Sequence, residues 1–388
     1  MGRSGRKRGA IALALCVLAA GGGAVAAAPA ERAQPDKTAN VRRIAHFPAA
    51  RGGEGGDIDF DGRRVYAADY DDGGRGGGIH VLDAAGARPK ILGHISCPGS
   101  QNDVATVRPG LIALGYHNSA CGGAKRGIKL IDVSNPRRPR FLGSVGTPGG
   151  THTLTAYPGK DLIYASPGGG GSLVARRAEQ IVDVSDPLRP RIVARFDPVT
   201  AGCHDLIFHF ERKSKLAFCA GDSETQIWDV ASPRKPKIVG RIDDPAISFH
   251  HSVAVTSDGE LAVVGDESTS SNCAGAPTGA IFAFDVTDPA APTAHGWFAV
   301  PRGRSRELLE LGYGCTAHNF SFLPGTRLLA AAWYRGGMNV VDWSDPDAPA
   351  EVAHFRTERT NYWSAYWHRG RIYANGRRGL DVFSVRGL

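Results

Sequence analysis

Short runs of alternating apolar and polar residues recur along the chain, and each run ends at an aspartate that polar residues and prolines follow. Alternation with a period of two predicts β-strands, and Pro and Asp between the runs predict turns. Each copy therefore predicts a strand, a turn and a second strand. The copies are IKLIDVSNPRRPRFLGSV from Ile128, EQIVDVSDPLRPRIVARF from Glu179, TQIWDVASPRKPKIVGRI from Thr225, IFAFDVTDPAAPTAHGWF from Ile281, MNVVDWSDPDAPAEVAHF from Met338 and a degenerate IHVLDAAGARPKILGHI from Ile79.

The spacing of the copies predicts the architecture. Two more strand-like runs precede each copy, as at residues 252–256 and 261–265, and no sustained helical period appears after residue 30. Four short antiparallel strands in a repeat of roughly 40 to 50 residues form a β-propeller blade. We therefore expect an all-β fold, a seven-bladed β-propeller. The strand-ending aspartates are Asp83, Asp132, Asp183, Asp229, Asp285, Asp342 and Asp381.

The last copy ends after three strands, and its fourth strand is predicted at the other end of the chain. RIAHF at residues 43–47 closely matches EVAHF at residues 351–355, the outer strand of the preceding copy. An N-terminal strand that completes the last blade would close the ring and remove its exposed edges. The expected organisation is a signal peptide at 1–30, a flexible segment at 31–41 and a propeller at 42–388.

The first 30 residues have the pattern of a secretory signal. Arg3, Arg6, Lys7 and Arg8 precede an apolar run, and small residues end near Ala28 or Ala30. The run is too short to span a bilayer, so we expect a secreted protein without a transmembrane segment. Its removal lowers the formal charge from +8 to +4, which weakens any case for nucleic-acid binding. We expect a monomer.

An even number of cysteines in an exported chain predicts disulfides. Six remain after the signal, and no two of them form a CxxC pair of the kind used by zinc or redox motifs. Their positions around the predicted strands suggest the pairs Cys97–Cys121, Cys203–Cys219 and Cys273–Cys315, although the count alone allows many connectivities.

The recurring phrases KLIDV, QIVDV and NVVDW, each followed by the polar and proline residues above, resemble the LVIVD-repeat family. The resemblance covers nearly the whole chain after the signal. It implies an exported bacterial or archaeal β-propeller, and the family carries no agreed activity. The fold therefore does not specify a function.

Candidate chemistry appears when the entrances to the innermost strands are aligned. Four consecutive repeats have histidine at the same aligned position of this entrance, the slot, although the chain has only 13 histidines in 388 residues. Imidazole binds copper, iron and zinc. A metal site is one interpretation; a polar channel lining without metal and buried structural histidines are the others. The slot residues are Glu54 (loosely aligned), Asn102, His152, His204, His251, His318 and Trp363.

Loops after the second strands open on the same face and supply polar side chains. Carboxylates near histidines could orient the imidazoles or act as bases. We single out Asp222, Asp266 and Glu267 as supporting residues, with Glu54 and Asn102 from the slot itself. His250 replaces His251 if the register is off by one. Further loop candidates are Asp69, Asp71, Asp72, His117, Asn118 and Glu224.

Two function classes remain open at this level. The first is an exported scaffold that binds an unknown small ligand or protein on the channel face, with a histidine-lined channel that holds a metal in one interpretation. The second is a metal-dependent oxidoreductase that uses copper, iron or zinc at the four histidines. Histidine-lined propeller channels occur in carotenoid-cleaving oxygenases and methanethiol oxidases, which is an architectural analogy only. Whether the protein is an enzyme is left open.

Overall fold

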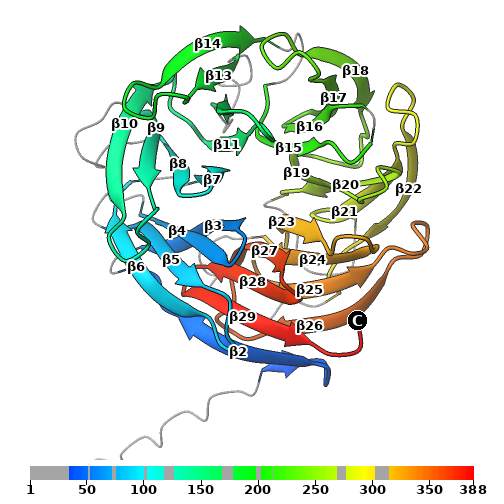
Figure 1. Cartoon of the computed structure of the whole chain (residues 1–388). Helices are drawn as coiled ribbons and strands as arrows, with labels where there is room; N and C mark the ends of the chain where they lie inside the picture. Colours follow the sequence, from blue (N-terminus) through cyan, green and yellow to red (C-terminus); the bar gives the residue numbers. More distant parts are fainter. Residues whose placement is uncertain are drawn as a thin grey trace, which may run out of the picture. The chain divides into compact units, whose positions relative to one another are not determined.

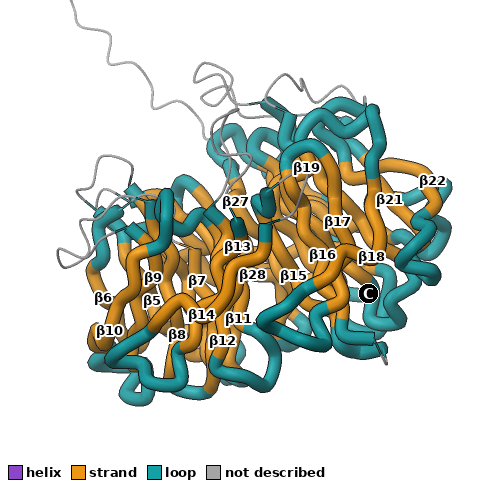
Figure 2. The backbone as a smooth tube through the Cα atoms, turned by 90° about the horizontal axis from the view of Figure 1, so that it is seen from above, coloured by secondary structure: helices purple, strands orange, loops and turns teal. Residues whose placement is uncertain are grey.

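The computed structural model describes residues 35–50, 53–71, 76–99, 103–117, 126–167, 178–197, 202–212, 214–268, 277–301 and 314–388. These residues form strands and connecting loops, and none of them is helical (Figure 2). The expectation of an all-β fold is confirmed.

Five antiparallel sheets have four strands each, in chain order or its reverse. Their strands are β3 (Glu54–Asp61), β4 (Arg64–Tyr70), β5 (Gly78–Asp83) and β6 (Lys90–Ser96); β7 (Asp103–Arg108), β8 (Leu111–Tyr116), β9 (Gly127–Asp132) and β10 (Arg140–Gly146); β11 (Thr153–Ala156), β12 (Leu162–Ser166), β13 (Glu179–Asp183) and β14 (Arg191–Phe196); β15 (Asp205–His209), β16 (Leu216–Gly221), β17 (Glu224–Asp229) and β18 (Lys237–Ile242); β19 (His250–Val255), β20 (Leu261–Asp266), β21 (Ile281–Asp285) and β22 (Thr293–Phe298).

A sixth sheet has nine strands and consists of two four-stranded antiparallel groups plus one short strand. Its order is β1-β26-β25-β24-β23-β27-β28-β29-β2, and the only parallel step joins β23 to β27 through two residue pairs. Its strands are β1 (Asp36–Lys37), β2 (Val41–Phe47), β23 (Ala317–Phe322), β24 (Leu328–Trp333), β25 (Gly337–Asp342), β26 (Ala350–Arg356), β27 (Tyr362–His368), β28 (Arg371–Gly376) and β29 (Gly379–Val385).

The first strand of every four-stranded unit lies innermost, and these strands form a circle. In residues 34–388, contacts run from β3 to β7, β11, β15, β19, β23 and β27, and β27 contacts β3 again (Figure 1). The described part of the chain therefore has a propeller-like arrangement around a central axis.

The recurring aspartates end their strands by capping turns. Asp132 Oδ1 accepts hydrogen bonds from the backbone N and the hydroxyl of Ser134, and Asp342 binds Ser344 in the same way. Such Asx turns reverse the chain between the third and fourth strands. The proline that follows also joins neighbouring sheets, because the Pro187 carbonyl accepts the Gly143 N–H at 2.8 Å.

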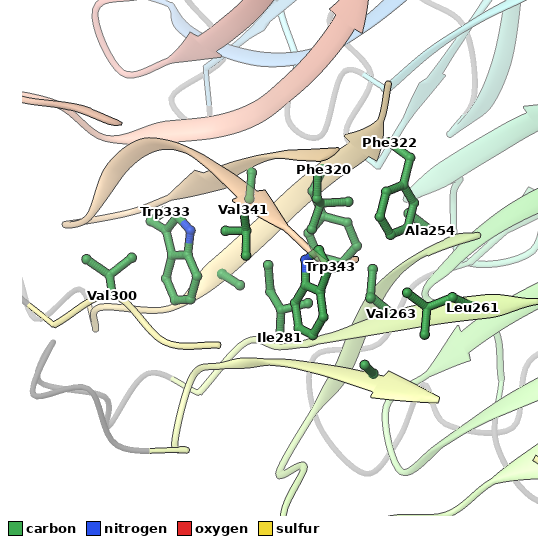
Figure 3. Close-up of a cluster of buried hydrophobic side chains, with 14 of the residues drawn as sticks. Ala254, Leu261, Val263, Ile281, Val300, Phe320, Phe322, Trp333, Val341 and Trp343 are labelled. Atoms are coloured by element: carbon green, nitrogen blue, oxygen red, sulfur yellow. The ribbon is translucent and has the colours of Figure 1, made fainter. Parts of the chain in front are cut away.

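Hydrophobic side chains fill the spaces between adjacent sheets. One cluster joins the unit of β19–β22 to that of β23–β26 and contains Phe320, Trp333 and Trp343 (Figure 3). Another joins Ile58 and Leu82 to Tyr373, which lie near opposite ends of the chain. Because no sheet buries both faces alone, the strands around the axis stabilise one another.

The N-terminal strand prediction is supported residue by residue. β2 pairs with β29, with Val41 opposite Val385 and Phe47 opposite Leu380. Within the segment 31–41, which was expected to be flexible, Asp36 and Lys37 form β1, which pairs with the open edge of β26. The signal peptide prediction lies outside the described residues.

Candidate functional site in the central channel

A cavity of about 690 Å³ lies between the innermost strands. A volume of this size is ordinary for a site that holds a small organic molecule. Its lining combines histidine and aromatic rings with carboxyl groups and apolar side chains. The cavity therefore provides both the space and the polar groups that a ligand site needs.

The four slot histidines form one continuous arc of rings around this cavity. Ring centroids are 4.3 Å apart between His152 and His204, 4.4 Å between His204 and His251, and 4.1 Å between His251 and His318. Trp363 continues the arc, 4.3 Å from His318. The repeat register thus brings together residues that are up to 211 positions apart in the sequence.

Burial keeps these imidazoles neutral. Loss of hydration is the largest cause that lowers the pKa of His152, His204, His251 and His318 well below the usual value, and neighbouring histidines lower it further. The His318 Nδ1 donates to the Trp363 carbonyl at 2.6 Å. A proton on Nδ1 leaves the Nε2 lone pair available to an electrophile such as a metal ion.

Glu267 faces two of the four histidines. Its carboxylate oxygens lie 3.4 Å from His251 Nε2 and 3.6 Å from His318 Nε2. Burial raises the Glu267 pKa to about 7, and a 3.0 Å hydrogen bond from the Tyr334 hydroxyl opposes this rise. Among the described residues, His251, Glu267 and His318 form a group that could hold a metal ion, with ligand atoms within 4.8 Å of one another.

The separations within this group are longer than hydrogen bonds. The 3.4 Å separation joins His251 Nε2 to Glu267 Oε2, and the 3.6 Å separation joins His318 Nε2 to Glu267 Oε1. Two atoms bound tetrahedrally to one ion at about 2.1 Å lie about 3.4 Å apart, so each imidazole could share an ion with one carboxylate oxygen. Hydrogen bonds between nitrogen and oxygen are shorter, at about 2.7 to 3.2 Å. His152 and His204 lie further along the arc and are not members of this group.

The other supporting residues that the structure describes make no hydrogen bond or ion pair with the histidine arc. Glu54 pairs with Arg377 at 3.5 Å and is not among the residues that line the cavity. Its slot is taken by Gly56, because a register shift separates Gly55 from Ile58. Ser364 binds the Gly56 carbonyl, as Ser252 binds that of His318. Asn102 lies outside the described residues.

Asp266 and Asp222 position the chain that leads to His251. Asp266 accepts hydrogen bonds from the backbone N of Ser248 and Phe249, at 3.0 and 2.9 Å, and from that of Gly279 at 2.8 Å. The Asp222 backbone pairs with that of His250, and burial raises the Asp222 pKa to about 6. Both residues therefore organise the loop, and in the described structure neither carboxyl is hydrogen-bonded to an imidazole of the arc.

The alternative register with His250 in the channel is wrong. The His250 side chain is completely buried away from the cavity, where its Nδ1 lies 2.9 Å from the Thr225 hydroxyl. His117 extends the arc, 4.9 Å from His152. Among the other loop candidates, Asp69 pairs with His80 and Glu224 with Arg241, Asp71 accepts the Gly76 N–H, and Asp72 and Asn118 lie outside the described residues.

One predicted disulfide is present as expected. Cys203 and Cys219 are bonded, with Cα atoms 5.4 Å apart, directly before His204 and on β16. Cys97 and Cys315 are also disulfide-bonded, and the partners predicted for them, Cys121 and Cys273, lie outside the described residues. The bonded cysteines brace the strand entrances that carry the histidines.

A second group of titratable side chains lines the cavity and was missed from the sequence. The Tyr366 hydroxyl donates to Asp57 at 2.9 Å, and Asp57 and Asp103 are hydrogen-bonded to each other. Burial raises the pKa of both, well above the usual range for Asp103, and raises that of Asp205 to about 7. These aspartates follow the slot residues by one position, so the same register identifies them.

Comparison with known families agrees with the repeat analysis. The model of the LVIVD repeat matches residues 122–147, which include the copy that begins at Ile128. The match confirms the resemblance drawn from the recurring phrases. No curated protein matches the chain in sequence. In the described part of the chain, no helix is long and apolar enough to cross a membrane.

Proposed function

We propose that this LVIVD-repeat chain is an exported propeller scaffold whose central channel binds a divalent transition metal and a small ligand. The observation that carries the proposal is the arrangement of His251, His318 and Glu267, two neutral imidazoles and a carboxylate, at separations suited to one ion. The cavity beside them leaves space for a second molecule. Two histidines and one carboxylate suit zinc or iron.

The scaffold in this proposal has seven blades. The nine-stranded sheet is counted as two, because its only parallel step is the short β23–β27 contact between two innermost strands. Pairing of β2 with β29 then completes the seventh blade. Seven buried clusters between neighbouring four-stranded units support this count among the described residues.

The extended arc suggests which histidines act as ligands. His251 and His318 bind the ion in this proposal, while His152 and His204 line the approach and supply a further ligand only if their rings turn. The wider four-histidine site predicted from the sequence is retained as an outcome of the test. It requires loss of metal when His152 or His204 is replaced.

Metal titration of protein purified without an affinity tag tests the proposal. We expect about one Zn²⁺ or Fe²⁺ per chain, lost in a His251→Gln, His318→Gln variant and kept in the matched His295→Gln control, whose ring pairs with Asp347 at the surface. Equal metal content in wild type and in the double variant would reject the site. Loss in a His152→Gln, His204→Gln variant would favour the four-histidine site.

A metal-dependent oxidoreductase is the second candidate. The specific observation in its favour is the two-histidine, one-carboxylate set, which leaves coordination positions open in non-haem Fe²⁺ oxygenases. Addition of nitric oxide to the Fe²⁺-loaded protein tests for an open position by electron paramagnetic resonance. A nitrosyl–iron signal is expected for the enzyme, and its absence from fully loaded protein would reject that candidate.

Export and a monomeric state complete the proposal. The signal-like first 30 residues and the disulfides support an oxidising compartment. A protein or small ligand on the channel face, and no nucleic acid, is the expected partner. Processing at Ala28 or Ala30, read by mass spectrometry of protein recovered from the medium or periplasm, tests this part.

A further inference from the structure

The formally charged side chains that line the cavity are all acidic, and its histidines are neutral. The described lining contains Asp57, Asp59, Asp103, Asp205 and Glu211, and no lysine or arginine. This differs from the chain as a whole, in which 46 lysines and arginines exceed 38 acidic residues. The interior of the channel therefore has the opposite charge balance to the rest of the protein, which favours a positively charged guest.

Most polar side chains directly after the slot residues join one innermost strand to the next. Thr153 donates to the His204 carbonyl, Ser252 to that of His318 and Ser364 to that of Gly56. Asp103 accepts the N–H of Leu154 at 2.5 Å. Because these side chains hydrogen-bond to the backbone of the next strand, the fold accounts for their presence and no ligand is needed to explain them.

Asp205 and Asn319 occupy the same position and depart from this pattern. The Asp205 carboxyl accepts the N–H of its own neighbour, Leu206, at 2.8 Å, and makes no hydrogen bond to the next strand among the described residues. Asn319 is 7% exposed, and its Oδ1 has no hydrogen-bond partner in the described structure. Both side chains line the cavity. A buried acceptor without a partner is costly, so it is expected to meet a donor in the working protein.

The geometry points to a small organic cation, a primary or secondary amine, as the guest of the channel, with its ammonium group held by Asp205 and with Asn319 as a further acceptor in the same lining. This deepens the small-ligand part of the proposed function. An ammonium has only donors to offer, which matches acceptors. The lining also contains apolar side chains such as Leu154, Leu206 and Val253, and the cavity of about 690 Å³ has space for an apolar or aromatic body on the amine.

The Asp57–Asp103 pair completes the electrostatic argument. Two hydrogen-bonded carboxyl groups must share one proton, so this pair carries about one negative charge rather than two. Burial raises the pKa of Asp205 to about 7, so this carboxyl is partly ionised near neutral pH, and a bound ammonium would stabilise its carboxylate form in this water-poor space. A carboxylate guest would meet repulsion from the same groups, and a neutral alcohol would leave them without a counter-ion.

Three probes of similar size test the inference: 2-phenylethylamine, 2-phenylethanol and 3-phenylpropionate, titrated by calorimetry into the full chain, once metal-free and once with Zn²⁺. We expect the amine to bind at least about 10-fold more tightly than the alcohol, and the acid to bind more weakly than either. Asp205→Asn should remove that preference, whereas the surface control Glu358→Gln should keep it. Asn319→Asp, which adds a carboxyl to the same cavity, should strengthen amine binding.

Equal binding of amine and alcohol, or a preference that Asp205→Asn leaves unchanged, would overturn the inference. If Asp205→Asn fails to fold, Asn319→Asp decides: no gain in amine affinity overturns it. Zn²⁺ uptake without amine preference would reject the cation guest and leave the metal site standing. Amine preference without Zn²⁺ uptake would reject the metal site and support the cation guest.

Discussion

Glu267→Gln should weaken metal binding and stabilise the metal-free fold. Because these two effects have opposite signs, they can be measured separately in one variant. Burial raises the Glu267 pKa from 4.5 to about 7. Below about pH 4.5 the carboxyl is protonated in both the folded and the unfolded chain, so its ionisation does not lower the free energy of unfolding. Between about pH 4.5 and 7 the unfolded chain ionises first, so the free energy of unfolding falls as the pH rises.

The size of this effect follows from the pKa change. Each factor of ten in an acid equilibrium corresponds to about 1.4 kcal/mol, so above pH 7 the buried carboxylate lowers the free energy of unfolding by at most about 3 kcal/mol. The side chain is 21% exposed to the channel, which reduces that figure. The Gln variant without metal should therefore unfold at higher denaturant concentration than wild type at pH 8, and at the same concentration at pH 4.

The same variant should bind Zn²⁺ at least about 100-fold more weakly, since it lacks one of three ligands and replacement of groups behind the ligands already costs about 10- to 100-fold. Urea unfolding at both pH values and Zn²⁺ titration at pH 8 provide the two measurements, with Glu358→Gln as the exposed control. An unchanged Zn²⁺ affinity would refute Glu267 as a ligand. A stability difference that is the same at pH 4 and pH 8 would refute the burial argument.

Three further predictions concern the scaffold. Trp343→Ala removes a fully buried ring and should lower the free energy of unfolding by about 3 to 5 kcal/mol, whereas Trp297→Ala, at a ring that is 40% exposed, should cost less than about 1.5 kcal/mol in the same urea titration. Gly143→Ala should lower the free energy of unfolding by about 1 to 3 kcal/mol, because the new Cβ would lie 2.5 Å from the Leu188 carbonyl oxygen. A variant with the same unfolding midpoint as wild type would contradict this contact. The Cys203→Ser, Cys219→Ser double variant opens a 16-residue separation and should cost roughly 3 kcal/mol; unchanged unfolding under oxidising conditions would show that the bond adds nothing.

The sequence was informative wherever one residue type recurs at one place in the repeat. The aspartates that end the third strands set the register, and the register alone placed His152, His204, His251 and His318 in one arc. The predicted register is wrong at Glu54, because the irregular pairing after Gly55 moves the slot to Gly56. A local bulge of this kind changes the register without leaving a clear pattern in a glycine-rich stretch.

The carboxylate partner could be proposed from the sequence but not selected. Glu267 was one of several acidic loop residues, and only the folded chain shows that it faces His251 and His318 while Asp266 turns to the backbone. Tyr334, which donates a hydrogen bond to Glu267, also follows the second strand of its repeat, but a tyrosine at that place gives no sign in the sequence of a carboxylate partner. Side-chain direction at a loop depends on contacts with neighbouring repeats, and these are not visible in a local pattern.

Anomalous X-ray scattering at the zinc or iron absorption edge, from crystals of the metal-loaded protein, tests the central claim most directly. The account predicts one strong peak at about 2.1 Å from His251 Nε2, His318 Nε2 and a Glu267 oxygen. A channel without a peak in fully loaded crystals, or a peak among other side chains, would contradict it.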